Sequence, residues 1–354
     1  MEKYFLNQNS LKEKKSTKIL KVYKFIFYIN LFIAIILLSL ILKFYCNFKS
    51  LKIFLILFKE IKNEEDVKLY IKNKTEFYYK YRLKFLKRHN IKYNESNLIT
   101  FQDKLNYLII HENPELKTDI VDKIKIHQYS IKILGKDICP PIIKVYENVD
   151  EINLDELPEK FLLKVNHGSG MNLICKDKLN FDLNMAKKKL KKWKNINYGL
   201  LRSEFQYFLV NRKIFAAPYL GDRINDYQVY CFNNQPKFIR VSKLLLEKNH
   251  TTLHNYYDLD WKLTDIDTNL RPYVRVPEIK IKKPKNLNLM LDYSKKLSVN
   301  FAFVRIDFYE INNKIYLSEM TFTPSNSLMK FKNLNQSKYL GSLIDISKIR
   351  KTII

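Results

Sequence analysis

An uncharged run of 18 residues, from Phe25 to Leu42, limits most strongly how this chain can fold. Its residues are apolar on every side of a helix, and Lys21, Lys24 and Lys43 flank it. A helix of this length would span about 27 Å, close to the thickness of the hydrocarbon core of a bilayer. We therefore predict a transmembrane helix over residues 25–42, with a buried core helix as the alternative. No small-residue cleavage site of the kind that ends a signal peptide follows it.

Positive charge is concentrated around this run. The whole chain has 63 Lys and Arg against 36 Asp and Glu, a net charge of +27, and residues 1–100 contribute 21 against 8. We predict a basic tail over residues 1–24 and a basic membrane-proximal connector over residues 43–100, which would contact anionic lipid head groups. Seven lysines precede the run and five follow within twenty residues. This count does not settle the orientation in the membrane, and it leans slightly against a catalytic domain on the cytoplasmic side.

Composition excludes several classes of protein. The chain is 46% hydrophobic, which is enough for a folded core. Of its 63 cations 53 are lysine, which indicates a general lysine bias, so no specific nucleic-acid partner is expected. The four cysteines, Cys46, Cys139, Cys175 and Cys231, contain no C-x-x-C pair, and this argues against a disulfide framework or a zinc ribbon.

Beyond residue 100 the pattern is that of a mixed α and β enzyme, and we predict one catalytic domain over residues 101–354. Helical spacing of apolar residues covers 101–111, 118–134 and 288–297, and a basic helix is expected over 182–194. Short apolar runs at 140–146, 160–165 and 171–175 are predicted to form strands. Two strand pairs meet at asparagine turns, one at residues 233–235 and one at 312–313, and both are predicted hairpins.

Two of only six glycines in the chain lie within three residues of sequence, and this placement needs a reason. Lys164 ends an apolar strand, and Gly168 and Gly170 follow in a short loop. Glycines let a backbone approach a phosphate closely, and the N–H groups of such a turn bind anions. Lys164 would add a positive charge for the phosphates. A plain hairpin turn beside a lysine remains the alternative.

A pair of carboxylates near the C-terminus forms the second candidate element. Side chains alternate along strands, and on the predicted hairpin at residues 312–313 Asp307 and Glu319 can point to the same face from adjacent strands. Two carboxylates at this separation repel unless a cation lies between them, and Mg²⁺ prefers such oxygen ligands. Arg305, two residues before Asp307, would share that face and could stabilise a transferring phosphoryl group. An exposed ladder of charged residues is the alternative.

Taken together and in this order, these segments resemble an ATP-grasp protein of the TupA-like family. The match covers about residues 104–343 and includes LPEKFLLKVNHGSG, DYQVYCFNNQPKFIRV and FAFVRIDFYEINNKIYLSEMTFTP. The resemblance implies an α+β fold whose two subdomains clamp ATP. It also implies a Mg²⁺-dependent ligase that activates a carboxylate as an acyl phosphate and joins it to an amine or similar nucleophile. The family is associated with teichuronopeptide and other cell-surface polysaccharides, so a surface polysaccharide or its lipid-linked precursor is the expected partner.

The resemblance also assigns roles to individual residues. Lys123 and Lys164 would contact the ATP phosphates, with Lys164 and Arg305 acting in catalysis. Residues 214–219 would form the hinge that reads adenine through its backbone. The remaining expected ligands are the loop residues His167, Gly168, Ser169 and Gly170 at the phosphates, Asp226 at the ribose, and Asp307, Glu319 and Thr321 at the metal.

This chain departs from the family pattern in three places. The glutamate that usually opens the adenine hinge is replaced by Ala216-Ala217-Pro218. The usual asparagine ligand two residues after Glu319 is Thr321, although TupA-like members often have threonine here. The glycines that commonly follow Pro324 are replaced by Ser325-Asn326-Ser327. These changes leave open a weakened nucleotide site and a protein of reduced activity.

Two other functions stay open from the sequence. A glycosyltransferase would use a D-x-D metal motif, for which only Asp258-Leu-Asp260 and Asp265-Ile-Asp267 qualify, and neither follows an apolar strand. A non-enzymatic basic protein would bind nucleic acid or anionic lipid in a salt-dependent way. His250 and His254 have metal-ligand spacing but lack the glutamate of a zinc motif, so a loop without metal is expected there. The single apolar run predicts a single-pass membrane protein. Because an ATP-using enzyme should face the cytosol, we expect its catalytic domain on the cytoplasmic side.

Overall fold

The computed structural model describes residues 61, 64–222, 224–244, 252–268, 273–279 and 281–349, and the structural statements below concern these. The predicted transmembrane helix at 25–42 and the tail before it lie outside this range. Among the described helices, none is long and apolar enough to span a bilayer. The chain divides into two compact units, Met1–Glu64 and Glu65–Ile354, and the second contains every strand described here.

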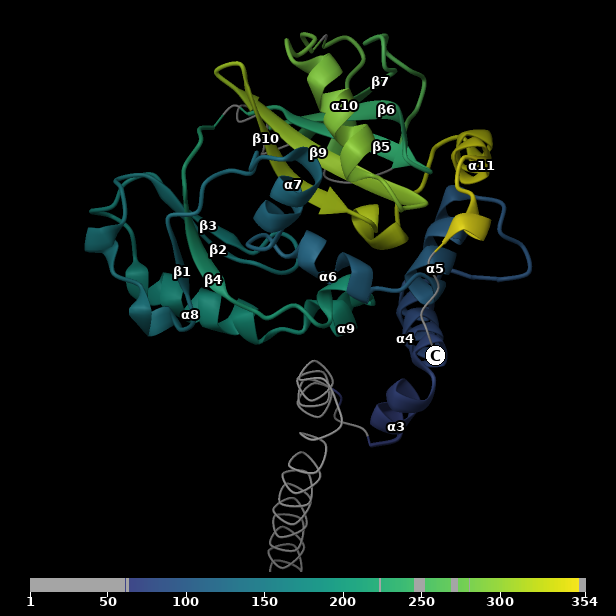
Figure 1. Ribbon diagram of the computed structural model, residues 1–354, viewed down its shortest axis with the longest axis horizontal. Helices are drawn as coiled ribbons and strands as arrows, with labels where there is room; N and C mark the ends of the chain where they lie inside the picture. Colours follow the sequence, from purple (N-terminus) through teal and green to yellow (C-terminus); the bar gives the residue numbers. More distant parts are fainter. Residues whose placement is uncertain are drawn as a thin grey trace, which may run out of the picture. The chain divides into compact units, whose positions relative to one another are not determined.

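Two antiparallel sheets form the framework of the second unit (Figure 1). The four-stranded sheet has the order β1-β4-β2-β3, and the six-stranded sheet has the order β10-β9-β5-β6-β7-β8, with only β7 and β8 parallel. The strands of the four-stranded sheet are β1 (Lys144–Tyr146), β2 (Phe161–Val165), β3 (Asn172–Cys175) and β4 (Ile214–Pro218). Those of the six-stranded sheet are β5 (Asp226–Phe232), β6 (Gln235–Leu244), β7 (Thr252–Tyr257), β8 (Tyr273–Arg275), β9 (Phe303–Ile311) and β10 (Lys314–Thr321).

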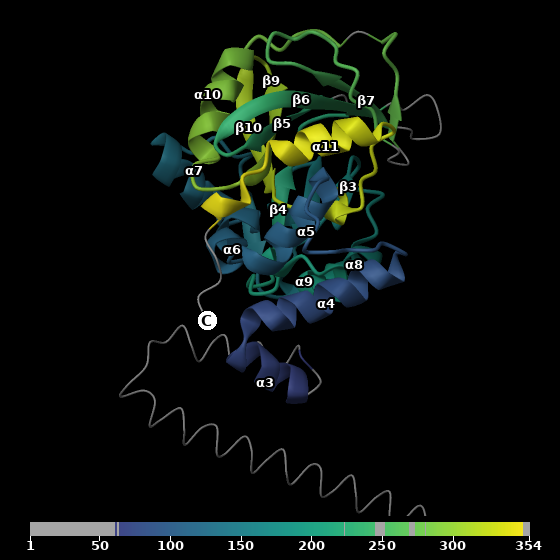
Figure 2. The same ribbon diagram turned by 90° about the vertical axis from the view of Figure 1, so that its right-hand side faces the viewer.

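Helices cover both sheets. Helix α8 packs against β2, α10 against β5, β6 and β9, and α5 contacts both α4 and α11 (Figures 1 and 2). Several begin with a side-chain cap, such as Thr100 at α5 and Asp182 at α8. The helices are α3 (Glu64–Lys72), α4 (Lys74–Arg88), α5 (Phe101–His111), α6 (Glu115–Val121), α7 (Ile126–Leu134), α8 (Leu183–Asn195), α9 (Tyr198–Arg202), α10 (Leu287–Leu297) and α11 (Leu334–Ser342).

Both predicted hairpins are confirmed. Asn233 and Asn234 connect β5 to β6, and Asn312 and Asn313 connect β9 to β10, all four with φ between 45° and 69°. Two consecutive positive φ values define the turn whose twist suits a two-residue hairpin, and asparagine tolerates them better than most residues. The second turn pairs Ile311 with Lys314, and a register shift between Leu317 and Glu319 then places Glu319 opposite Asp307.

One sequence prediction fails in an informative way. The helical pattern at 118–134 is broken, because α6 ends at Val121 and α7 begins at Ile126. In the break, the Asp122 carboxylate accepts the Ile124 N–H at 2.9 Å, and the Lys123 N–H donates to the Asn166 carbonyl at 3.0 Å. Local side-chain bonding of this kind competes with helix formation. As a result, the backbone of Lys123 lies beside the loop that follows β2.

One face of the six-stranded sheet is apolar, and the other face has an aromatic half and a polar half. Val229, Ile306 and Phe308 belong to a cluster that also contains residues of α10. On the opposite face, Tyr230, Phe303 and neighbouring aromatics pack with α5 and α11. Beyond them, towards the start of β5, this face becomes polar, because Asp226, Gln228, Arg305 and Asp307 follow in strand register. The functional side chains lie on this polar half.

Candidate active site

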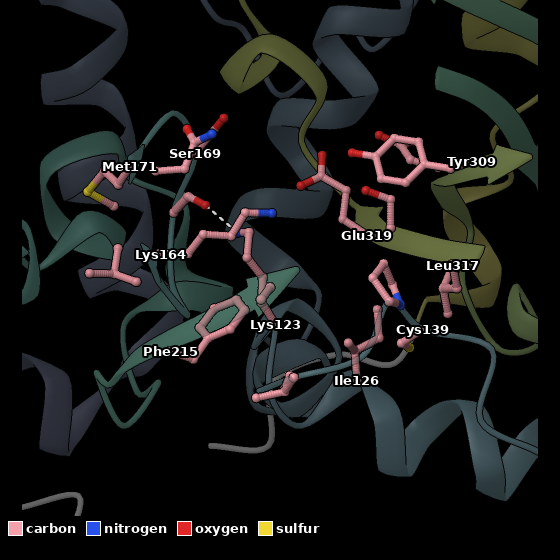
Figure 3. Close-up of a pocket in the computed structure, with 18 of the residues that line it drawn as sticks. Lys123, Ile126, Cys139, Lys164, Ser169, Met171, Phe215, Tyr309, Leu317 and Glu319 are labelled. Atoms are coloured by element: carbon pink, nitrogen blue, oxygen red, sulfur yellow. Dashed lines mark hydrogen bonds between the residues drawn. The ribbon is translucent and has the colours of Figure 1, made fainter. Parts of the chain in front are cut away.

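The loop between β2 and β3 is held against Lys123. The ammonium group of Lys123 donates a 2.6 Å hydrogen bond to the carbonyl of Gly168. Figure 3 shows Lys123 beside Lys164 at one side of a pocket. Gly168 has φ of 74°, and an added Cβ would lie 2.5 Å from the ring of Tyr198. Gly170 has φ of 73°. Both φ values lie in the left-handed region, which explains why glycine occupies these two positions.

Asn166 connects this loop to the neighbouring strand. Its side-chain amide donates to the Asn211 carbonyl at 2.9 Å, and its side-chain oxygen accepts the Lys213 N–H at 2.8 Å. Its backbone carbonyl accepts from Lys123. Asn166 is only 1% exposed, so these bonds fix the positions of three segments relative to one another.

A cavity of about 250 Å³ lies between the two sheets. The four-stranded sheet and the segments beside it contribute Lys123, Lys164 and the loop residues Gly168 to Met171, and the six-stranded sheet contributes Asp226, Asp307 and Glu319 (Figure 3). Apolar walls are supplied by Ile126, Val165, Phe215, Ala217 and Leu317. Lysines on one side and carboxylates on the other suit a phosphate chain bridged by a cation.

The hairpin β9–β10 presents a connected group of polar side chains. Asp307 lies opposite Glu319, and Arg305 opposite Thr321. Arg305 holds Asp307 through two bonds, Nε to Oδ1 at 2.7 Å and Nη2 to Oδ2 at 2.5 Å. The same Nη2 reaches Glu319 at 3.2 Å and the Thr321 hydroxyl at 3.1 Å. The predicted sharing of one face by Arg305, Asp307 and Glu319 is confirmed.

Ionisation at the site follows from burial and charge. Burial lowers the pKa of Lys164 to about 8, and the neighbouring charge of Lys123 acts in the same direction. Burial alone would raise the pKa of Glu319, but the charges of Lys123 and Arg305 outweigh it and hold that pKa below its usual value. Lys164 is therefore mostly protonated at neutral pH but loses its proton as the pH rises through about 8, and Glu319 is an ionised carboxylate at neutral pH.

The carboxylates differ in how available they are to a metal ion. Asp307 is 1% exposed and has both oxygens on Arg305, whereas the side chain of Glu319 is 34% exposed and lines the cavity. Two carboxylates and the hydroxyl of Thr321 form the hard oxygen donor set that suits Mg²⁺. Glu319 is the open ligand, and Asp307 would share its charge between the cation and Arg305.

A second cavity, of about 400 Å³, shares Ser169, Asp226 and Glu319 with the first. Three arginines line it, Arg202, Arg240 and Arg305. The carboxylate of Glu204, which also lines it, accepts a hydrogen bond from the hydroxyl of Thr323 and is 6% exposed. Burial raises the pKa of Glu204 to about 7. The cavity therefore offers cations for an anionic group and one carboxyl that titrates near neutrality.

Not every residue implied by the resemblance lines these cavities. His167 is fully buried, and its Nε2 donates to the Ile196 carbonyl at 3.0 Å instead of facing the phosphate side. Burial lowers its pKa to about 4, so it is neutral. Asp226 lines both cavities, and burial raises its pKa to about 6. Ala217, in the hinge, lines the first cavity from β4.

The motifs considered for other functions lie elsewhere. His254 is buried within strand β7 and not in the loop that the sequence predicted, and His250 lies outside the described residues. The Asp258 carboxylate accepts the N–H groups of Asp260 and Lys262 and so shapes a turn. Asp267 forms an ion pair with Lys332 at 2.6 Å. These contacts give the D-x-D segments structural roles.

Two residues of the site carry no motif that sequence reading could have found. Glu204 precedes a single 3-10 turn (Phe205–Tyr207), and Arg82 lies on α4, more than 200 positions before the loop that it contacts. Arg82 donates to the side-chain oxygen of Asn326 at 3.0 Å, to its carbonyl at 2.8 Å, and to Asn106 at 2.8 Å. It is fully buried.

Arg82 stabilises a strained loop in the wall of the second cavity. Ser325, Asn326 and Ser327 have φ of 51°, 58° and 57°, three consecutive left-handed residues where glycine would be free of strain. The helix that carries Arg82 lies within residues 43–100, which the sequence suggested as a connector. The part of this segment from Glu65 onwards belongs to the same compact unit as the sheets.

Removing Arg82 is expected to expose this strain. Arg82→Ala leaves acceptors of the buried Asn106 and the partly buried Asn326 without their donor, and we expect it to lower the free energy of unfolding by about 3 kcal/mol. Ser325→Gly should recover about 1 kcal/mol in that background, because glycine adopts this φ without strain. Chemical unfolding in a double-mutant cycle measures the coupling. Asn313→Gly, at a left-handed turn residue outside this contact, is the matched control and should show no coupling.

Comparisons with known proteins complete the description of the site. The family model described as TupA-like ATPgrasp matches residues 103–345. A search of curated proteins found no match. Among solved structures, a D-alanine–D-alanine ligase from Bacillus anthracis is similar at 16% identity and a TM-score of 0.33, over 62% of this chain and 64% of that one. Another from Helicobacter pylori shows 17% identity and a TM-score of 0.35, over 69% and 68%.

An L-amino acid ligase from Bacillus licheniformis is similar at 9% identity with a TM-score of 0.37, over 58% of this chain and 44% of that one. These values are too low to transfer any property from the solved structures. The family model, by contrast, covers well over half of the chain and includes every strand described above. This chain belongs to the TupA-like ATP-grasp family, and its α+β framework is the ATP-grasp fold.

Proposed function

We propose that this protein is a Mg²⁺-ATP-dependent ligase that activates a carboxylate and joins it to an amine or a similar nucleophile. The observation that carries the proposal is the cavity between the sheets. Lys123 and Lys164 enter it from one side, and Asp307 and Glu319 enter it from the other. Such an arrangement binds a polyphosphate and its metal ion together, which a single basic or acidic patch does not achieve.

The residues have distinct roles in this proposal. Lys123 and Lys164 bind the phosphates, and the N–H groups of the Gly168–Gly170 loop cover them. Asp307 and Glu319 would hold Mg²⁺, which neutralises phosphate charge when bound. Burial alone would lower the pKa of Arg305, but the charge of Asp307 raises it well above its usual value. A permanent cation at this point stabilises the phosphoryl group during transfer.

The second cavity is the proposed binding site of the substrate carboxylate that ATP activates. Arg202, Arg240 and Arg305 favour a carboxylate there, and the shared residue Glu319 places this second cavity next to the phosphate end of the first cavity.

The proposed reaction has two steps. In the first step a carboxylate oxygen of the substrate bonds to the terminal phosphorus of ATP and ADP leaves. In the second step the nucleophile bonds to the acyl carbon, phosphate leaves, and the nucleophile loses a proton. Glu204, with a pKa of about 7, is the group on this cavity suited to accept that proton.

The cellular setting belongs to the same proposal. We propose that residues 25–42 anchor the protein in a membrane and that the catalytic unit faces the cytoplasm, where ATP is available. Residues 43–60, with their lysines, would contact anionic lipids. A surface polysaccharide or its lipid-linked precursor is the proposed substrate, since a membrane anchor keeps an enzyme beside a lipid-linked acceptor.

A trapping experiment tests the reaction class. The full-length protein is incubated with Mg²⁺-ATP, hydroxylamine and a panel of amino acids, uronic acids and acidic oligosaccharides. Hydroxylamine captures an acyl phosphate as a hydroxamate, so we expect ADP and a hydroxamate to form together with at least one carboxylate. Glu319→Gln protein is the control and should form neither. If nucleotide sugars are instead consumed without ATP, the protein transfers glycosyl groups.

A further inference from the structure

We propose that His127, Asp137 and Cys139 form a binding site for Zn²⁺ in the wall of the nucleotide cavity. One possible ligand atom from each residue, an imidazole nitrogen, a carboxylate oxygen and a thiol sulfur, lies within 4.8 Å of the others. Within the described part of the chain, no other group of three such residues meets this spacing. The three side chains play no part in the reaction proposed above.

The chemistry of the ligands favours zinc over magnesium. Nitrogen and sulfur ligands suit Zn²⁺, whereas Mg²⁺ requires oxygen ligands such as those of Asp307 and Glu319. Zinc bonds of about 2.0–2.3 Å in a tetrahedron separate neighbouring ligand atoms by about 3.3–3.8 Å. His127 Nδ1 and Asp137 Oδ2, now 2.7 Å apart, would therefore separate by about 0.6 Å as the metal replaces their hydrogen bond.

The protein already holds these ligands in place. His127 lies in the first turn of α7, and Ser130 in the same helix donates to the Lys136 carbonyl and accepts the Ile138 N–H at 3.2 Å. The Ile138 carbonyl accepts from Leu317 of β10 at 2.8 Å. The Asp137 carboxylate also accepts the Cys139 N–H at 2.9 Å. These bonds fix the loop after α7 before any ion binds, which is the main requirement of a metal site.

The position of the site gives it an open coordination position. His127 and Cys139 line the first cavity, and Figure 3 shows Cys139 beside Ile126 and Leu317, away from Lys164 and the glycine loop. The side chain of His127 is 17% exposed and that of Asp137 is 40% exposed, so an ion can enter. Three protein ligands leave the fourth position of zinc for water. Bound zinc would connect α7 to β10 through the loop and stiffen this wall.

Metal titration of the full-length protein tests the proposal. After treatment with a chelator, the protein is titrated with Co²⁺ in the presence of excess Mg²⁺. We expect one equivalent of Co²⁺ to produce a near-ultraviolet absorption of cobalt–thiolate bonds, and Zn²⁺ to displace it. Cys139→Ser should abolish this absorption and His127→Gln should weaken Co²⁺ affinity at least tenfold. Cys175→Ser, Cys231→Ser and Cys46→Ser are matched controls that should leave it unchanged.

Several results would overturn the proposal. One is the absence of cobalt–thiolate absorption in the wild-type protein, which means that the contact between His127 and Asp137 is only a hydrogen bond between helix and loop. Another is absorption that survives in Cys139→Ser or is lost in Cys46→Ser, since the metal would then bind elsewhere. Thermal unfolding gives a second measure. Zn²⁺ should raise the melting temperature of the wild type and leave that of His127→Gln unchanged.

Discussion

Asp307→Asn is expected to lower the free energy of unfolding by about 3–5 kcal/mol, whereas Glu319→Gln should change it by less than about 1 kcal/mol. The two residues face each other on one hairpin, but only Asp307 is bound by both arms of the buried Arg305 side chain. Removing the charge of Asp307 leaves a guanidinium buried without its main partner. Removing that of Glu319 leaves the stronger pair intact, and the glutamate is partly exposed.

Binding should separate from stability in these variants. Both substitutions remove a proposed ligand of Mg²⁺, so both should weaken Mg²⁺-dependent ATP binding tenfold or more. Chemical unfolding and isothermal titration of the same preparations provide the two measurements. Asp292→Asn, at an exposed ion pair with Lys296, is the control and should affect neither. Equal loss of stability for Asp307→Asn and Glu319→Gln would contradict the assigned contacts.

Lys164→Met is expected to weaken ATP binding by about 10- to 100-fold while making the free protein more stable. The loss follows from removing a charge-assisted hydrogen bond to phosphate. The gain follows because burial and the nearby charge of Lys123 make a protonated Lys164 unfavourable in the folded state. Methionine has a similar length and carries no charge. Titration with ATP and thermal unfolding of one preparation measure both effects.

The control for this variant is Lys125→Met. Lys125 is exposed, forms an ion pair with Asp119 at 2.7 Å, and lies two residues from Lys123. It should leave both ATP affinity and stability nearly unchanged. A Lys164→Met protein that binds ATP as tightly as the wild type would show that the nucleotide does not occupy this cavity.

ATP binding should also depend on pH through Lys164. The pKa of the free protein's Lys164 is about 8, below its usual 10.5, and bound phosphate would raise it again. The affinity is therefore full below pH 8 and falls as the pH rises above 8, because binding then requires uptake of a proton. Calorimetry in buffers of different ionisation enthalpy measures that uptake at pH 9. Lys164→Arg, which stays charged, should show none.

Parts of the site that depend on local pattern could be predicted from the sequence. Alternation along β9 places Arg305 and Asp307 on one face regardless of the rest of the fold, but the asparagine turn alone would set Ser318 opposite Asp307. Glu319 lies opposite Asp307 because the register shifts between Leu317 and Glu319, an irregularity that the sequence did not predict. Lys164 and its glycine loop follow from an equally local signal. The break between α6 and α7 was not predicted, because the bond from Lys123 to Asn166 that accompanies it is tertiary.

Contacts between distant segments account for what the sequence could not show. The neutral, buried state of His167 depends on Ile196, and the left-handed loop at Ser325 depends on Arg82. The replacement of glycines after Pro324 suggested a weakened site. In the structure the loop residues have left-handed φ values, and hydrogen bonds from Arg82 of α4 hold the loop. Helix α4 lies outside the family match, and no local sequence pattern indicates this contact.

The most direct test of the proposed nucleotide site is a thermal-shift measurement on the full-length protein with ATP, ADP and UDP-sugars, each with and without Mg²⁺. A ligand that binds only the folded state raises the melting temperature by mass action. We predict that ATP with Mg²⁺ gives the largest increase and that the increase disappears in Lys164→Met and Glu319→Gln. Stabilisation by a UDP-sugar but not by ATP would contradict the assignment of this cavity to ATP.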